Sequence, residues 1–196
     1  NISNKTGVLV AEMSNKLEEL KDSPKYWMCG LPPLITREGW HAEGFEILSD
    51  REVQVIEGDL SCGKCMEFYG PLTLVFGNVS AQNLIIEGEV LIQGNLQVEN
   101  VIYAYSESMG KLWVSGDLQA RTWLSLGQQL EVRGAVSVEH FCTQQSFGYQ
   151  MEQFPEDQDI ITDLDEHLAP ELFKDKALDF EELLMRIEKN EAILRS

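Results

Sequence analysis

The motif that decides the fold reads Val90-Leu91-Ile92-Gln93-Gly94-Asn95-Leu96-Gln97-Val98, and it returns as Leu112-Trp113-Val114-Ser115-Gly116-Asp117-Leu118-Gln119-Ala120. Six windows share it when a glycine is taken as the origin, and these glycines are Gly58, Gly77, Gly88, Gly94, Gly116 and Gly134. The residue two places before each glycine is β-branched, and those two and four places after it are apolar or small. Residues one and three places after it are polar, apart from Leu91 and Ala135. This period of two predicts β-strands whose even positions face inward.

The spacing of the glycines predicts how these strands are arranged. Leaving out Gly88, successive glycines lie 19, 17, 22 and 18 residues apart, and Gly88 precedes Gly94 by six. Steps near 18 with a sub-period of six predict coils of three short strands with glycine at the corners. We therefore predict a mainly β protein with a right-handed parallel β-helix, or β-solenoid, over residues 51–143. A loop is expected at residues 104–110, where the longest step falls.

A β-sandwich is the main alternative, because it also consists of short alternating strands. Its hairpins would mirror the pattern across two-residue turns, whereas here a polar residue recurs at one offset after the glycine. The repeat therefore favours the solenoid.

Both flanks are predicted to be helical caps, since an open stack of coils exposes strand edges at its ends. Residues 1–50 form the predicted N-terminal cap, with a helix over residues 11–21 and an apolar, turn-rich segment that includes Trp27 and Trp40. Residues 179–196 form the C-terminal cap. There Asp179 and Glu182 resemble a capping box, and an apolar stripe follows at Phe180, Leu183, Leu184 and Ile187. This helix could equally form a homodimer interface. With 196 residues, the chain fits a single domain overall.

The charge of the chain limits its partners. A formal net charge of −18 argues against nucleic acid and anionic membranes and favours a basic protein. The acids concentrate in the connector at residues 144–178, and no Lys or Arg occurs between Gly134 and Phe173. The candidate partner-binding residues are Phe154, Glu156, Asp157, Asp159, Asp163, Asp165 and Glu166. The alternative is a solvated connector whose aromatic residues pack on the coils.

Catalytic chemistry finds little support in the sequence. Cys62 and Cys65 have the CxxC spacing of zinc and redox sites, but no second pair completes a tetrahedral set. Cys62 also occupies an inward position, where a thiol packs as a small hydrophobic group. His140 and Cys142 could form a dyad, but no third member accompanies them. We predict no catalytic residue, no metal and no cofactor.

The sequence also bears on localisation. No stretch approaches the roughly 20 apolar residues that cross a bilayer, and no basic patch with an apolar run follows Asn1. The four cysteines are too few and too uneven for a secreted disulfide scaffold. We expect a cytoplasmic protein with reduced thiols.

The two windows quoted first resemble polymer-forming bacterial β-solenoids of the bactofilin type. They are also similar to short acidic solenoid proteins encoded beside bacterial polymorphic toxins. The resemblance covers residues 53–141 and implies the fold. Bactofilin filaments are solenoid almost throughout, whereas this chain has folded-looking flanks that oppose end-to-end growth.

Three functions follow as hypotheses. The leading one is a non-enzymatic binding protein, an immunity protein that neutralises a basic bacterial toxin such as a nuclease. The second is a self-assembling scaffold like the bactofilins. The third is an enzyme that uses Cys62 and Cys65 or the surroundings of His140.

Overall fold

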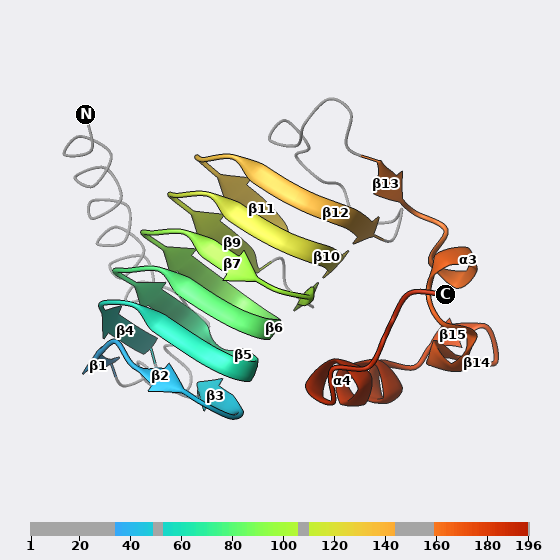
Figure 1. Ribbon diagram of the computed structural model, residues 1–196, viewed down its shortest axis with the longest axis horizontal. Helices are drawn as coiled ribbons and strands as arrows, with labels where there is room; N and C mark the ends of the chain where they lie inside the picture. Colours follow the sequence, from blue (N-terminus) through green and yellow to red (C-terminus); the bar gives the residue numbers. More distant parts are fainter. Residues whose placement is uncertain (1–33, 49–52, 106–109, 144–158, 196) are drawn as a thin grey trace, which may run out of the picture.

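A computed structural model describes residues 34–48, 53–105, 110–143 and 159–195. Its main element is a β-solenoid of about six coils, whose strands stack one above the other in Figure 1. All strand pairs of the 13-stranded sheet are parallel, so the predicted stack of parallel coils is confirmed. The strands are β1 (Leu34–Glu38), β2 (His41–Ala42), β3 (Glu46–Leu48), β4 (Val53–Glu57), β5 (Leu60–Val75), β6 (Val79–Ile92), β7 (Leu96–Val98), β8 (Val101–Tyr105), β9 (Lys111–Val114), β10 (Leu118–Leu126), β11 (Gln129–Val132), β12 (Val136–Thr143) and β13 (Ile160–Ile161).

The repeat positions coincide in space as the sequence predicts. The positions two residues after the glycines pair from coil to coil, in the order Leu60, Val79, Leu96, Leu118 and Val136. The positions two residues before the glycines pair from coil to coil in the same way, in the order Ile56, Val75, Ile92, Val114 and Val132. Both columns belong to one hydrophobic core, together with the large inward side chains of Phe68, Trp123 and Phe141. The interior of the solenoid is therefore a continuous apolar column.

Glycine is required at the corners because the backbones of successive coils approach closely. A Cβ atom on Gly94 would lie 2.6 Å from the carbonyl oxygen of Gly77, closer than any side chain tolerates. Gly88 belongs to a different corner, where it has a φ of +97° and stacks between Gly70 and Gly110. The six-residue spacing of Gly88 and Gly94 thus marks two corners of one coil.

The polar residues that follow Gly58, Gly77, Gly94 and Gly116 form a ladder along the stack. The Oδ1 atom of Asp59, Asn78, Asn95 or Asp117 accepts a hydrogen bond from the backbone N–H of the equivalent residue in the next coil, at 2.7 to 2.9 Å. The ladder ends at Ala135, whose side chain has no acceptor. These exposed side chains satisfy backbone groups that the tight corner leaves outside the strand ladders.

Replacing Asn95 by alanine is expected to lower the free energy of unfolding by about 0.5–1.5 kcal/mol, because the Asp117 amide loses its acceptor at a corner that water can reach. Urea denaturation measures the loss. The control is Gln97→Ala, an exposed position on the same coil, which should leave stability within about 0.5 kcal/mol of the wild type. Equal losses in the two variants would show that the ladder contributes nothing.

The first coil begins earlier than predicted. Strands β1, β2 and β3 pair in parallel with β4 and β5, so the solenoid strands start at Leu34 and the predicted boundary at residue 51 is wrong. The sequence pattern does not reveal this coil, because charged residues occupy two of its inward positions. Arg37 is in register with Ile56 of the core, and Glu46 with Met66. Inward charges at an end coil are a known defence against edge-to-edge pairing.

Two further predictions in this part of the chain concern an N-terminal helix and a loop. The helix expected at residues 11–21 and the segment around Trp27 lie outside the described residues. Ala104 and Tyr105 belong to β8 rather than to the loop expected at residues 104–110. The alternation continues through them, since Ala104 is buried in the core.

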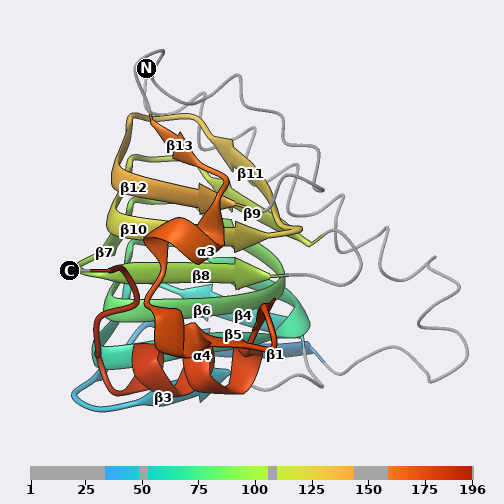
Figure 2. The same cartoon turned by 90° about the vertical axis from the view of Figure 1, so that its right-hand side faces the viewer.

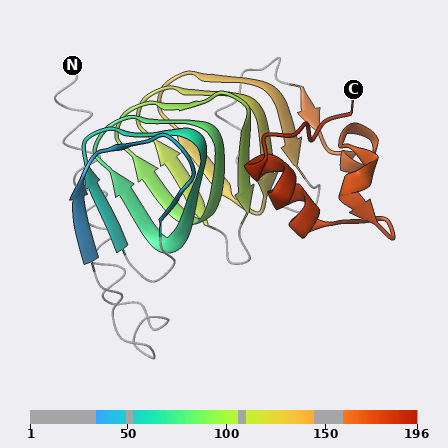
Figure 3. The same cartoon turned by 60° about the horizontal axis from the view of Figure 1, so that its bottom comes forward.

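The C-terminal segment lies along one side of the stack and does not form a cap over the last coil (Figures 1 and 2). Figure 3 shows the same segment outside the coils. Strand β13 pairs with β12 of the last coil, while the final helix contacts β5 near the other end. Its remaining elements are α3 (Leu164–His167), a 3-10 turn η1 (Pro170–Leu172), the hairpin β14 (Phe173–Lys174) and β15 (Ala177–Leu178), and α4 (Phe180–Glu188).

Helix α4 confirms its predicted start and is shorter than predicted. The Asp179 side chain accepts hydrogen bonds from the amides of Glu181 and Glu182, as expected of an N-cap. The reciprocal half of the capping box is absent, because the Asp179 amide donates to the Leu172 carbonyl. Asn190, with a φ of 58°, ends the helix before the predicted position 194.

Candidate partner-binding surface

An apolar column on the outside of the solenoid holds the C-terminal segment. We call it the lateral face; it consists of the outward residues Ile85, Tyr103, Leu124 and Cys142, which are paired in register on β6, β8, β10 and β12, together with Cys65 on β5. Outward positions of a solenoid normally meet water, so four apolar neighbours in register require a cover. The cover consists of Leu164, Leu168, Leu172, Leu183, Ile187 and Ile193.

The predicted acidic residues that the structure describes lie at one end of this cover. Asp163 at the start of α3, and Asp165 and Glu166 within it, are here called the acidic turn; all three are exposed, as is Asp159 just before β13. Asp163 precedes α3 without forming a side-chain cap, so its carboxylate is not used within the helix. Phe154, Glu156 and Asp157 lie outside the described residues.

The backbone of the acidic turn is fixed by buried leucines and by the C-terminal tail. Leu164 and Leu168 are buried on the lateral face, and the C-terminal tail runs alongside them. The Arg195 amide donates to the His167 carbonyl, and the Arg195 guanidinium donates to the carbonyls of Leu168 and Asp165. The carboxylates therefore project from a fixed turn, and this arrangement suits recognition of a basic surface with little ordering cost.

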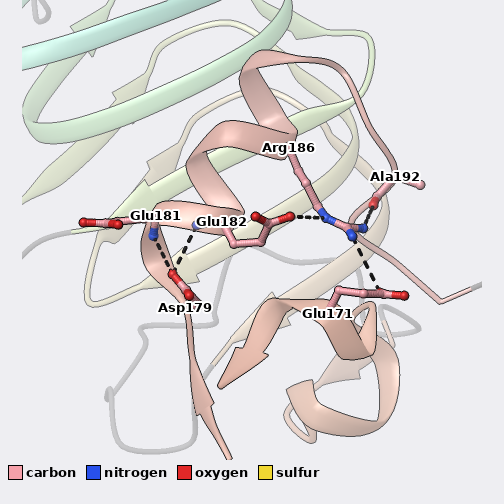
Figure 4. Close-up of polar contacts among 6 residues, drawn as sticks. All are labelled: Glu171, Asp179, Glu181, Glu182, Arg186 and Ala192. Atoms are coloured by element: carbon pink, nitrogen blue, oxygen red, sulfur yellow. Dashed lines mark hydrogen bonds and ion pairs between the residues drawn. The ribbon is translucent and has the colours of Figure 1, made fainter. Parts of the chain in front are cut away.

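Arg186 fixes the other end of the cover (Figure 4). Its guanidinium donates to Glu182 Oε1 at 3.0 Å and to the Ala192 carbonyl at 3.2 Å, and it forms an ion pair with Glu171 at 3.6 Å. These contacts tie α4 to η1 and to the tail. They also neutralise Glu171.

Asn83 anchors α4 to the coils, and sequence reasoning missed it. Its side chain is 1% exposed, donates to the Ile187 carbonyl at 3.1 Å and to Asn190 Oδ1 at 3.0 Å, and accepts from the Val101 amide. Asn100 adds a 2.7 Å bond to the same Asn190 oxygen. The only available signal was an amide at a strand position whose coil neighbours, Cys65 and Val101, are apolar.

Glu67 is a second buried polar residue near α4 that the sequence did not single out. It lies on β5 next to Ile47 and Ile85, is 3% exposed, and its Oε1 atom has no hydrogen-bond partner. Burial raises the pKa of Glu67, and the nearby Glu188 carboxylate on α4 raises it further, while a hydrogen bond from Tyr69 opposes the rise.

The three cysteines in the described part of the chain are packed as structural residues. Cys62 faces the core and Cys65 the lateral face, on opposite sides of the sheet, and the register of β5 with β6 shifts between them. Burial raises the pKa of both thiols and raises that of Cys142 to about 12, so all three are protonated at neutral pH. His140 and Cys142 point to the same side of β12. Cys142, however, pairs with the half-buried Ile161 in an apolar cluster. A protonated, covered thiol is a poor nucleophile.

Across the described ranges there is no group of three or more His, Cys, Asp or Glu residues that could hold a metal ion. Nor does any helix in this part of the chain combine the length and apolar character needed to span a bilayer. Comparison with protein-family models, curated proteins and solved structures found no match for the chain.

Proposed function

We propose that the protein is a non-enzymatic binding protein whose acidic turn engages a basic protein partner. The observation that supports this best is the exposure of Asp163, Asp165 and Glu166 on a turn whose backbone is held by Arg195 and by the buried residues Leu164 and Leu168. A fixed set of like charges steers a partner of opposite charge and selects its orientation. The net charge of −18 adds a long-range field of the same sign.

The resemblance to acidic solenoids encoded beside polymorphic toxins suggests which kind of protein the partner is. The partner is then a bacterial toxin, and the protein acts in the cytoplasm as its immunity protein. A nuclease is a suitable target, because an enzyme that holds nucleic acid presents a basic surface. The same resemblance supports a right-handed sense for the solenoid.

A self-assembling scaffold is less consistent with the first coil. Arg37 and Glu46 would meet the apolar core of any coil stacked end-on against them, and burying those charges there is costly. The proposal therefore expects a discrete monomer or dimer in light scattering at high concentration. Mass that grows continuously with concentration would instead support the scaffold.

Reversing two charges of the acidic turn tests the proposed surface. The double variant Asp163→Lys with Asp165→Lys is expected to slow association with the product of the neighbouring gene by about tenfold or more at low salt, because steering contributes about 10 to 1,000-fold to such rates. Surface plasmon resonance at several salt concentrations measures the rate, and the difference should shrink as salt screens the charges.

The matched control is Glu57→Lys with Glu99→Lys, which changes the net charge equally at exposed positions on the solenoid. It should slow association much less. Equal slowing by the two pairs would show that only net charge matters, and absence of any complex would contradict the proposed function.

A further inference from the structure

The Glu67 carboxyl lies beneath α4, where β5 contacts that helix. A carboxyl group that is 3% exposed and has an unpaired oxygen is costly to keep ionised, since it has lost its water without gaining a full set of partners. Its neighbours in register, Ile47 and Ile85, offer no hydrogen bond from their side chains. The cost therefore depends on the groups that approach from β5 and from α4.

None of the groups that face Glu67 in the described structure is a cation. Tyr69 and Cys65 come from β5 itself, and Glu188 comes from the last turn of α4. Tyr69 lies near Tyr105, whose hydroxyl donates to Glu87 at 2.9 Å.

The bases closest in sequence make no described contact with Glu67. Lys64 and Lys189 are exposed, as Glu188 is, and Arg186 is bound to Glu182 and Glu171 (Figure 4). When Glu67 ionises, two carboxylates thus face each other across the contact between β5 and α4 with no described positive charge between them.

The same contact determines whether α4 stays on the lateral face. Leu183 and Ile187 are buried there in one cluster with Cys65 and Ile85, and Asn83 binds the end of the helix. The helix has only nine residues, too few to be stable in water by itself, so it depends on this docking. A charge buried under its last turn acts directly against the docking.

We propose that α4 is a proton-linked latch, which docks most tightly on the solenoid while Glu67 is protonated and loosens when Glu67 ionises opposite Glu188. Loosening would uncover the apolar lateral face beside β5 without unfolding the coils. This regulation is independent of the acidic turn, and it goes beyond the proposed binding function.

The direction of the pKa shift agrees with this linkage. The docked state raises the pKa of Glu67, whereas the undocked side chain returns to a value of about 4.3 in water. The docked state therefore binds the proton more tightly. Docking is strongest at low pH, weakens as the pH rises through the window between the two values, and stays constant above the raised value.

Hydrogen exchange between pH 5 and pH 8 tests the latch on the full chain. Expressed as protection factors, which remove the intrinsic effect of pH, the amides of α4 should lose up to about tenfold protection per pH unit within the window. Glu67→Gln should remove this dependence and give the helix higher protection than the wild type at pH 8. Glu57→Gln, at an exposed carboxylate, should behave like the wild type.

Alkylation of Cys65 gives an independent measure, because this thiol is fully buried under the cover. At pH 8 it should react more slowly in Glu67→Gln than in the wild type, and the two rates should converge near pH 5. A Glu188→Gln variant should show a smaller pH dependence than the wild type, because it removes the repulsion but not the burial. Protection of α4 that is independent of pH in the wild type, or an equal slope in Glu67→Gln, would overturn the latch.

Discussion

Replacing Trp123 by alanine is expected to lower the free energy of unfolding by about 3–5 kcal/mol, a large part of the 5–15 kcal/mol typical of a domain. Trp123 is fully buried and points into the core from β10, between Ile102 of one neighbouring coil and Phe141 of the other. Its ring centroid lies 6.2 Å from that of Phe141. Removing it empties a volume that the closely spaced coils cannot close, and urea denaturation measures the loss.

A phenylalanine at the same position separates packing from hydrogen bonding. The Nε1 atom of Trp123 is buried and has no hydrogen-bond partner, so Trp123→Phe removes no bond and relieves an unsatisfied donor. The phenylalanine variant should therefore lose much less stability than the alanine variant. Equal losses would mean that the indole contributes through something other than the volume it fills.

Replacing Asn83 by alanine is expected to cost about 2–4 kcal/mol, because it leaves the buried Val101 amide without an acceptor, at about 1–3 kcal/mol, and also removes two side-chain hydrogen bonds that hold the end of α4. The Val101 amide loses its acceptor, and the Ile187 carbonyl loses its side-chain donor. The loss should appear first in hydrogen exchange of α4, since Asn83 joins that helix to the coils. Denaturation with urea then gives the total.

Asn100→Ala is the graded control for this anchor. Asn100 donates one described side-chain hydrogen bond, to the Asn190 oxygen, and is half-buried, so its loss should cost about 1 kcal/mol. If Asn83→Ala left both α4 exchange and total stability unchanged, the lateral anchor would have no energetic role.

The coils were predictable because their signal is local and repeated. Each copy carries the same alternation around a glycine, and the inward residues of every copy meet in one core. The first coil lacked this signal because Arg37 and Glu46 stand where later coils have Ile56 and Met66. A prediction that relies on apolar inward positions fails at an end coil, where charged inward residues oppose edge-to-edge pairing.

The surroundings of α4 were not predictable in the same way. The alternation rule assigns outward residues to water, and it cannot show that Ile85, Tyr103 and Leu124 are covered by a segment far along the chain. For the same reason the roles of Asn83 and Glu67 could not be predicted, since Ile187, Asn190 and Glu188 belong to that segment. The acidic turn was found from composition alone, whereas its backbone anchor at Arg195 depends on tertiary contacts.

The C-terminal segment changes how the whole stack should melt. In a bare solenoid each coil contacts only its neighbours, so coils can fray one by one from the ends. Here a single strip of chain is attached to the last coil through β13 and to an early one through α4. Any coil between these attachments can open only if the strip also detaches, and heating should therefore produce one sharp transition rather than a gradual one.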